Sequence, residues 1–297
     1  MEFIHVHIPV LIDPVIEFLD IQPDDIVLDC TVGFGGHAAL LLPLLGEKGR
    51  YIGLDRDEAA WTFCRERFAD NPKFEAIHTT FADFKSVLDR LGLPHITKCL
   101  VDLGISSFQL DHPERGFSFL TDAPLDMRMD AQAKLDAATI LNTYPPTELS
   151  RIFIEFGELR NPAKLVDTIF DTRKKLRYAT TFQLVDTIKK SFFFKNSRPF
   201  YMKTCSQVFQ ALRIEVNGEL DQLNRCLTQL TDSLAPGGRA AFISFHSTED
   251  RIIKYFVKAR PDTLARVTKK AISATQTEIR ANSRSKSAKV RVFEKRC

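Results

Sequence analysis

The feature that most constrains this 297-residue chain is an apolar run that leads directly into a glycine-rich turn. Residues 26–36 pass from a β-type apolar stretch through an acid to three glycines, and a helix-forming run follows. A second apolar run, 51–54, then ends on Asp55. Strand, glycine turn, helix, strand and acid is the pattern of a doubly wound sheet that binds a nucleoside cofactor. We therefore predict an α/β fold with the ligand at the carboxyl ends of the strands.

The spacing of the turn separates the cofactors that such a loop could hold. A dinucleotide site has the pattern G-x-G-x-x-G, whereas this chain has Asp29 ahead of Gly33, Gly35 and Gly36. An acid in that place would repel a pyrophosphate, but it could hold the ammonium of a methionine moiety, directly or through water. The pattern favours S-adenosylmethionine over NAD. A tight turn without any ligand is the third interpretation.

Strand and helix patterns alternate through the first hundred residues, and one strand follows much later. The predicted strands are 26–30, 51–55, 75–81, 99–104 and 239–246, and the predicted helices between them are 36–46, 57–70 and 83–91. A crossover between neighbouring parallel strands needs about a dozen residues, so the gap before the fifth strand is far too long. It indicates an inserted domain.

The insert is predicted to be mostly helical. The helical patterns cover 135–141, 146–156, 162–177 and 181–193, followed by one long helix over 209–233 and a turn at 235–238. We accordingly divide the chain into a discontinuous cofactor domain, 1–112 and 209–297, and a helical insert, 113–208.

Composition excludes several classes of protein. Hydrophobic residues make up 44% and charged residues 27%, which is ordinary for a globular protein, and no run approaches the ~20 apolar residues of a membrane span. Residues 1–7 lack the features of a secretory signal. The six cysteines show no C-x-x-C spacing, and no cluster has the spacing of metal ligands. A cytoplasmic protein with reduced thiols and no metal is expected.

Positive charge is concentrated near the C-terminus. Residues 251–297 hold 14 lysines and arginines against 3 acids, although the whole chain carries only +3. This asymmetry suggests a surface for a polyanion, with a solvated or disordered basic tail as the alternative. A second segment, 191–203, mixes aromatics with bases as surfaces for single-stranded RNA do. Such a segment is more often a helix end that closes a small core.

The chemistry is expected where the fourth strand ends. Asp102 is followed there by Ser106 and Ser107, and an acid with hydroxyl groups could receive an exocyclic amine beside a methyl donor. An acid at a strand end is more commonly a turn former. His37 and His246 each follow a predicted strand, and a single histidine in such a place is more often structural.

Several long strings carry a resemblance to a known family. They are 7–11, 29–37, 53–57, 101–111, 115–119, 124–130, 209–217, 244–251 and 283–291. In these strings the chain closely resembles the bacterial 16S rRNA cytosine-N4 methyltransferases of the MraW (RsmH) family, nearly end to end. The sequence departs from that family's usual pattern in the insert, at 157–160 and 204–208, which affects the expected RNA contacts rather than the cofactor site.

The resemblance implies a class I Rossmann-like methyltransferase sheet with a helical insert for RNA recognition. It implies S-adenosylmethionine-dependent methylation of the N4 amine of one cytosine in the decoding centre of 16S rRNA, within the small ribosomal subunit. The cofactor contacts it implies are Gly35, Gly36, His37, Asp55, Phe81, Asp102 and Gln109. The residues assigned to the target amine are Asp102, Ser106, Ser107 and His246.

Two rival functions remain at this level. A small-molecule N-methyltransferase would not need the basic C-terminal segment, and an RNA-binding assembly factor without catalysis would not need the glycine loop with Asp55 and Asp102. The sequence leaves the assembly state open, with a homodimer as one alternative.

Overall fold

The computed structural model describes residues 9–195 and 197–297. The segment in which no secretory signal is expected, 1–7, and the start of the string at His7 lie outside the described residues. The chain divides into two compact units: a first unit of residues up to Gly104 together with Leu220–Cys297, and a second unit, Ile105–Glu219. No helix among the described residues combines the length and apolarity of a membrane span.

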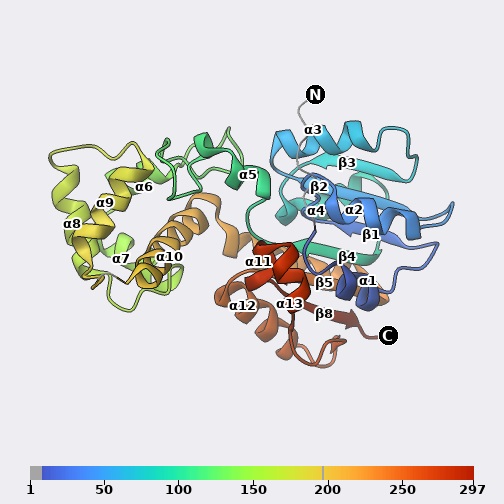
Figure 1. Ribbon diagram of the computed structural model, residues 1–297. Coiled ribbons are helices and arrows are strands. Elements are labelled where there is room, and N and C mark those ends of the chain that lie inside the picture. The colour runs from blue at the N-terminus through green and yellow to red at the C-terminus, as the bar shows by residue number, and fades with distance from the viewer. Residues whose placement is uncertain (1–8, 196) are drawn as a thin grey trace. The chain divides into compact units, whose positions relative to one another are not determined.

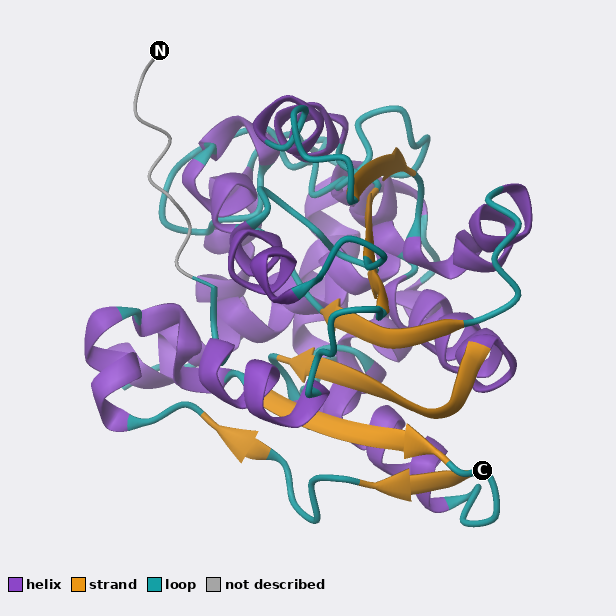
Figure 2. Ribbon diagram, turned by 90° about the vertical axis from the view of Figure 1, so that its right-hand side faces the viewer, coloured by secondary structure: helices purple, strands orange, loops and turns teal. Residues whose placement is uncertain are grey.

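The first unit is built on one sheet of eight strands in the order β3-β2-β1-β4-β5-β8-β6, with β7 paired to β8. Figure 2 shows the strands lying side by side. Strands β1 to β5 are parallel, and β8 runs antiparallel to β5. The strands are β1 Ile26–Asp29, β2 Arg50–Asp55, β3 Phe74–His78, β4 Ile96–Asp102, β5 Leu234–Ser244, β6 Leu264–Arg266, β7 Ile272–Ser273 and β8 Lys289–Lys295. This confirms the predicted class, a Rossmann-like α/β sheet.

Helices cover both faces of this sheet because successive residues of a strand point to opposite sides. Val27 and Leu100 pack with α1 Ile12–Leu19, α2 Gly36–Leu41 and the short helix η1 Leu42–Leu44, and Cys64 of α3 Glu58–Arg67 joins the same core. Leu28 and Val101 pack with α4 Phe84–Arg90, α11 Glu219–Ser233 and α12 Ser247–Lys258 on the other side. The remaining short helices are η2 Phe81–Asp83, α13 Gln276–Ala281 and η4 Ser283–Ser287.

The second unit is helical (Figure 1). It has its own apolar core. Its helices are α5 Ser107–Asp111, η3 Pro113–Arg115, α6 Ala137–Thr143, α7 Pro146–Glu155, α8 Ala163–Arg173, α9 Thr181–Ser191 and α10 Arg198–Asn217. Capping residues explain where several of these helices begin. Asp136 accepts from the Thr139 amide, and Thr180 forms a capping box with Gln183.

The structure differs from the sequence-based boundaries within α10. The expected boundary at 208/209 lies in the middle of this 20-residue helix, whose buried residues belong to the core of the second unit. The long helix expected over 209–233 is two helices, because Gly218 adopts a left-handed conformation (φ 58°) and ends α10.

Three further expectations need correction. The segment 235–238 is an irregularity within β5 instead of a turn before it: the register passes from Ile96–Leu234 to Lys98–Arg239. The basic segment 251–297 is not a disordered tail, since it forms α12, α13 and β6 to β8 and its last strand pairs with β5. β3 also ends at His78, three residues before the predicted end.

Candidate active site

The glycine turn after β1 is tied down by backbone hydrogen bonds. The Val32 amide donates to the Leu54 carbonyl at 2.9 Å, and the Gly35 amide donates to Val32 at 2.8 Å. Gly33 (φ 54°) and Gly35 (φ 73°) are both left-handed, a conformation that favours glycine. The turn therefore depends on these two residues, and Gly36 begins α2 directly after them.

The two left-handed glycines have different surroundings. A Cβ on Gly35 would lie 2.6 Å from the Phe68 ring, so this glycine is required by packing against α3. A Cβ on Gly33 would meet only the Thr31 carbonyl oxygen, at 3.9 Å. Gly33 thus faces open space where a ligand could approach the backbone closely, whereas Gly35 positions the turn.

Asp55, at the end of β2, closes the glycine turn from the other side. Its two carboxylate oxygens accept hydrogen bonds from the Gly33 amide (2.9 Å) and the Asp57 amide (2.8 Å). Burial raises the pKa of Asp55. Each carboxylate oxygen can accept more than one hydrogen bond, so both can still receive a ligand hydroxyl. This is the arrangement expected for a ribose contact.

Asp29 has a different role from the one considered from the sequence. The Tyr51 hydroxyl donates to it at 2.7 Å and the Thr31 amide at 3.2 Å, and the side chain is buried. Burial raises the pKa of Asp29 to about 7. Because Asp29 is only 1% exposed, it organises the turn from inside the protein and is not accessible for direct contact with an ammonium group.

Asp102, at the end of β4, is the acid that offers an unfilled acceptor. Its side chain is 17% exposed, and its Oδ1 atom is buried without a hydrogen-bond partner among the described residues. Burial, together with the negative charges of Asp29 and Glu249, holds the pKa of Asp102 well above its ordinary value. The Asp102 amide donates to the Thr31 hydroxyl at 2.6 Å, which fixes β4 against the glycine turn. An unfilled buried acceptor of this kind calls for a polar or cationic ligand.

His37 lies beside Asp102. Its Nδ1 atom is 3.8 Å from Asp102 Oδ2, and its Nε2 atom is 3.0 Å from the Val10 carbonyl oxygen. Since a carbonyl oxygen only accepts, Nε2 carries a proton and donates to Val10. The structure thus brings His37, Asp55, Asp102 and the glycine turn together at the carboxyl edge of β1, β2 and β4, as expected from the sequence.

The other predicted site residues lie after β3 and at the start of α5. Phe81 begins η2, after β3, and its buried ring packs in the sheet core with Phe84 and Val87. Ser106 and Gln109 form the capping box of α5 in the second unit, and Ser107 is the first residue of that helix. The side chain of Ser107 lies outside the described part of the structure.

His246 follows β5, as predicted, but its ring caps a helix. Its Nδ1 accepts from the Glu249 amide at 3.4 Å, and its Nε2 lies 3.1 Å from the Glu249 carboxylate. Glu249 is buried and in turn accepts from the Phe245 amide at 2.9 Å. The sequence reasoning missed Glu249, although an acid three residues after an N-cap position is the signal of a capping box. These contacts place His246 at the start of α12, and its Nε2 atom is buried without a hydrogen-bond partner among the described residues; its role at the target amine stays a prediction.

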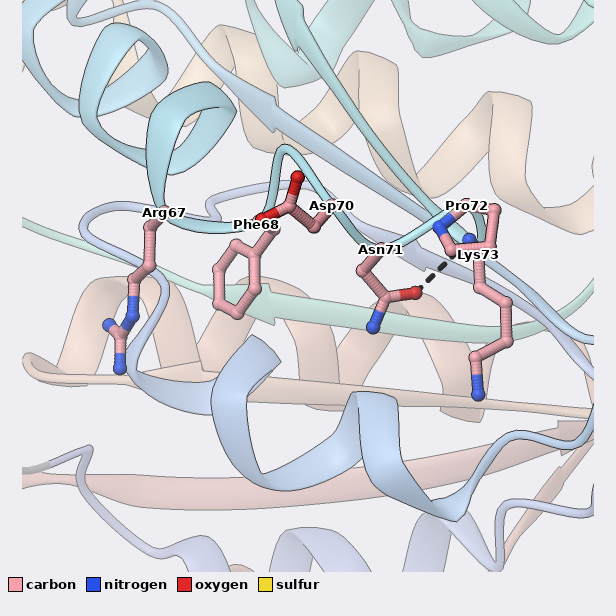
Figure 3. Close-up of a pocket in the computed structure, with 6 residues that line it drawn as sticks. All are labelled: Arg67, Phe68, Asp70, Asn71, Pro72 and Lys73. Carbon is pink, nitrogen blue, oxygen red and sulfur yellow. Dashed lines mark hydrogen bonds between the residues drawn. The ribbon is translucent and has the colours of Figure 1, made fainter.

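Among residues 9–195 and 197–297, no group of three or more His, Cys, Asp and Glu side chains is arranged to hold a metal ion. Figure 3 shows a surface hollow of about 500 Å³ lined by Arg67, Phe68, Asp70, Asn71, Pro72 and Lys73. It is lined by residues that precede β3, and two of them contact the glycine turn: Arg67 donates to the Phe34 carbonyl oxygen at 2.8 Å, and the Phe68 ring packs against Gly35.

The chain is similar to known proteins over nearly its whole length. The sequence model of the MraW methylase family matches residues 4–296. Ribosomal RNA small subunit methyltransferase H of Heliobacterium mobile is 41% identical, with 97% of this chain and 98% of that protein aligned. The proteins of the same name from Thioalkalivibrio sulfidiphilus (40% identity; 97% of each chain) and Clostridioides difficile (37% identity; 99% of this chain and all of the relative) match equally fully.

Proposed function

The chain belongs to the MraW methylase family, and from that premise we propose that it uses S-adenosylmethionine to methylate RNA of the small ribosomal subunit. We further propose that the acceptor is the exocyclic N4 amine of one cytosine in the decoding centre of 16S rRNA, modified in the cytoplasm. The observation that carries the proposal is the unfilled Asp102 acceptor beside the glycine turn and Asp55.

The described side chains fit S-adenosylmethionine. When bound, this group supplies an electrophilic methyl carbon on a sulfonium sulfur. Asp102 Oδ1 would accept from the cationic amino group, which replaces the missing partner of a buried oxygen. Asp55 would accept from the ribose hydroxyls, and the Gly33 backbone leaves room for close approach. His37 Nδ1 lies 3.8 Å from the other carboxylate oxygen of Asp102, and the Phe81 position after β3 is proposed to lie beside the adenine.

Methyl transfer to nitrogen depends mainly on the alignment of the nucleophile with the methyl donor. An amine conjugated to a cytosine ring is a weak nucleophile, so a hydrogen-bond acceptor on its N–H strengthens it as the bond to carbon forms. We propose that Asp102 is that hydrogen-bond acceptor or that it positions the amine. Ser106, Ser107 and Gln109 of α5 are proposed to contribute to cofactor and amine binding. The base must be splayed out of any stack to reach such a site.

The cysteines support transfer to nitrogen over transfer to carbon. Methylating C5 of cytosine needs a thiolate that adds to the ring. Cys64, Cys99 and Cys205 are buried, and burial raises the pKa of each thiol. Cys30 and Cys226 are also buried, and the one exposed thiol is the C-terminal Cys297. None of these is poised as a nucleophile.

Transfer of a labelled methyl group tests the proposed function directly. Small ribosomal subunits from cells that lack this modification should accept label from S-adenosylmethionine, and nucleoside analysis should find it as N4-methylcytidine. Label on the C5 carbon or on another nucleoside would contradict the N4 assignment. Label on small molecules but not on RNA would favour the small-molecule alternative, and binding to subunits without any transfer would favour the assembly factor.

A trapping experiment separates nitrogen from carbon chemistry. RNA that contains 5-fluorocytosine should give no covalent adduct with the enzyme, and both Cys99→Ala and Cys205→Ala should retain transfer. A trapped adduct that disappears in either variant would show a thiol nucleophile and overturn the assignment.

A further inference from the structure

The turn between α9 and α10 in the second unit combines positive charge with aromatic rings. We call residues 189–203 the basic aromatic turn. This segment has five bases and five aromatic residues, and it contains no acid. Lys189, Lys190, Lys195, Arg198 and Lys203 are all exposed. The nearest preceding acid, Asp186, pairs with Lys189 at 3.4 Å.

Its aromatic residues form a cluster with exposed members at the edge. The Phe194 ring lies 5.2 Å from Phe200 and 5.3 Å from Tyr201, centre to centre, so it anchors the turn on α10. Phe193 and Phe200 remain 80% and 45% exposed. The interpretation of this segment as a plug for a small core therefore holds for Phe194 but not for Phe193.

A hollow of about 270 Å³ lies within the turn and is lined by Lys189, Phe194, Ser197, Arg198 and Tyr201. Two aromatic side chains and two bases line it. The turn thus presents apolar ring surface and positive charge together.

Two of the bases occupy places that local structure disfavours. Lys195 has a left-handed backbone (φ 44°), a conformation that suits glycine or asparagine. Arg198 is the first residue of α10, where a positive charge opposes the helix dipole. Lys189 and Lys190, in contrast, stand in the last turn of α9, where the dipole favours them. Side chains that break local rules are expected at functional positions.

We propose that the basic aromatic turn binds single-stranded RNA, with a splayed base stacked on Phe193 or Phe200 and neighbouring phosphates held by Lys195 and Arg198. The proposal rests on the proposed function, since it names the part of the second unit that meets the RNA substrate. Five bases without an acid complement a phosphate backbone, and exposed rings set among them stack on bases of any sequence.

The first test compares two RNAs of equal charge on the full-length protein. An unstructured oligouridine of about 16 nucleotides and an abasic strand of the same length differ only in the bases that can stack. The wild type should bind oligouridine roughly tenfold more tightly. Phe193→Ala and Phe200→Ala should bring the two affinities together. Phe182→Ala is the matched control, an α9 ring with 42% exposure outside the turn, and it should keep the wild-type preference.

The second test separates charge from structural support. Lys195→Gly should weaken binding of both RNAs and lower the salt slope by ~0.7, the value for one lost phosphate contact on a single strand. Because it relieves the left-handed backbone, it should also raise the melting temperature by about 1–3 °C. A merely structural lysine would not give lower affinity together with higher stability.

The outcomes distinguish this proposal from the proposed function. Wild-type affinity and base preference in all turn variants would overturn the proposal, even where the wild type methylates small subunits. Binding of anionic vesicles that the turn variants lose, with unchanged RNA binding, would identify a membrane surface and also overturn it. Absence of methyl transfer by the wild type would contradict the proposed function, while the comparison of oligouridine with abasic RNA still decides the role of the turn.

Discussion

The carboxyl edge of the sheet, which holds three acids, and the basic aromatic turn are suited to different kinds of ligand. At the edge, Asp29, Asp55 and Asp102 are largely buried, and backbone amides or a tyrosine hydroxyl hold the first two in place. In the turn, the charged groups are exposed lysines and an arginine. Buried acceptors with fixed partners suit a small ligand of defined shape, whereas exposed cations suit a flexible polyanion. Substitutions at the edge should weaken binding at any salt concentration. The effect of substitutions in the turn on binding should depend strongly on the salt concentration.

The largest expected effect belongs to Asp102→Asn. It keeps the shape but removes the charge, so methyl transfer to small subunits should fall by about 10²- to 10⁴-fold while oligouridine affinity stays unchanged. Because burial raises the pKa of Asp102, binding of a cationic ligand should release a proton from the wild type at a pH below that raised pKa. Calorimetry in buffers of different ionisation enthalpy measures that release, which should vanish in Asp102→Asn. Equal proton release in both proteins would remove Asp102 from the cofactor site.

The next prediction tests whether the burial of Asp29 lowers the stability of the folded protein. Asp29 has a pKa of about 7 in the folded protein against an ordinary value of 3.8, so the folded state binds more protons between these values. Its contribution to stability therefore decreases as the pH rises from about 4 to 7. Asp29→Asn should raise the free energy of unfolding at pH 8 by up to about 4 kcal/mol and change it little at pH 4. Chemical denaturation at both pH values measures this, and equal effects at both would contradict the buried-acid interpretation.

A smaller effect is expected from Asp55→Asn. The amide retains one acceptor oxygen but sets an NH₂ group against either the Gly33 or the Asp57 amide. Affinity for S-adenosylmethionine should fall by roughly 10- to 100-fold, the worth of one hydrogen bond to a charged group. Asp55→Ala is a poorer test, since it would also release the glycine turn. Glu75→Gln, on the exposed side of the neighbouring strand, is the control, and an equal loss there would exclude a local ribose contact.

The prediction with the smallest effect tests whether the basic C-terminal segment binds phosphates, as is proposed for the basic aromatic turn. Arg291 of β8 donates to Asp250 of α12 at 2.7 and 3.1 Å, with both side chains 16% exposed. Arg291→Gln should therefore cost about 1–3 kcal/mol of stability and leave the salt slope of RNA binding unchanged. Lys286→Gln, at an exposed position, should leave stability unchanged. A lower salt slope in Arg291→Gln without a loss of stability would place Arg291 among the phosphate contacts.

Local patterns were enough to predict the parallel half of the sheet and most helices of the second unit. Each of those signals lies within a few residues: an apolar run before Asp29, the glycines that follow it, and the apolar periodicity of the helices. The same locality explains the errors. Gly218 stops a helix pattern that apolar periodicity alone would continue, and the irregularity at 235–238 depends on β4, which is far away in sequence.

What the sequence determined by itself was the α/β class, the inserted helical segment, the family resemblance and the position of the acids at strand ends. Tertiary structure alone decided which acid keeps an unfilled acceptor, because the partners of Asp29 and Asp55 come from Tyr51 and from the glycine turn. It also paired β8 with β5 and made Arg291, a base of the segment expected to bind a polyanion, a partner of Asp250. Burial and hydrogen bonding join residues that are distant along the chain, so no local pattern can assign them.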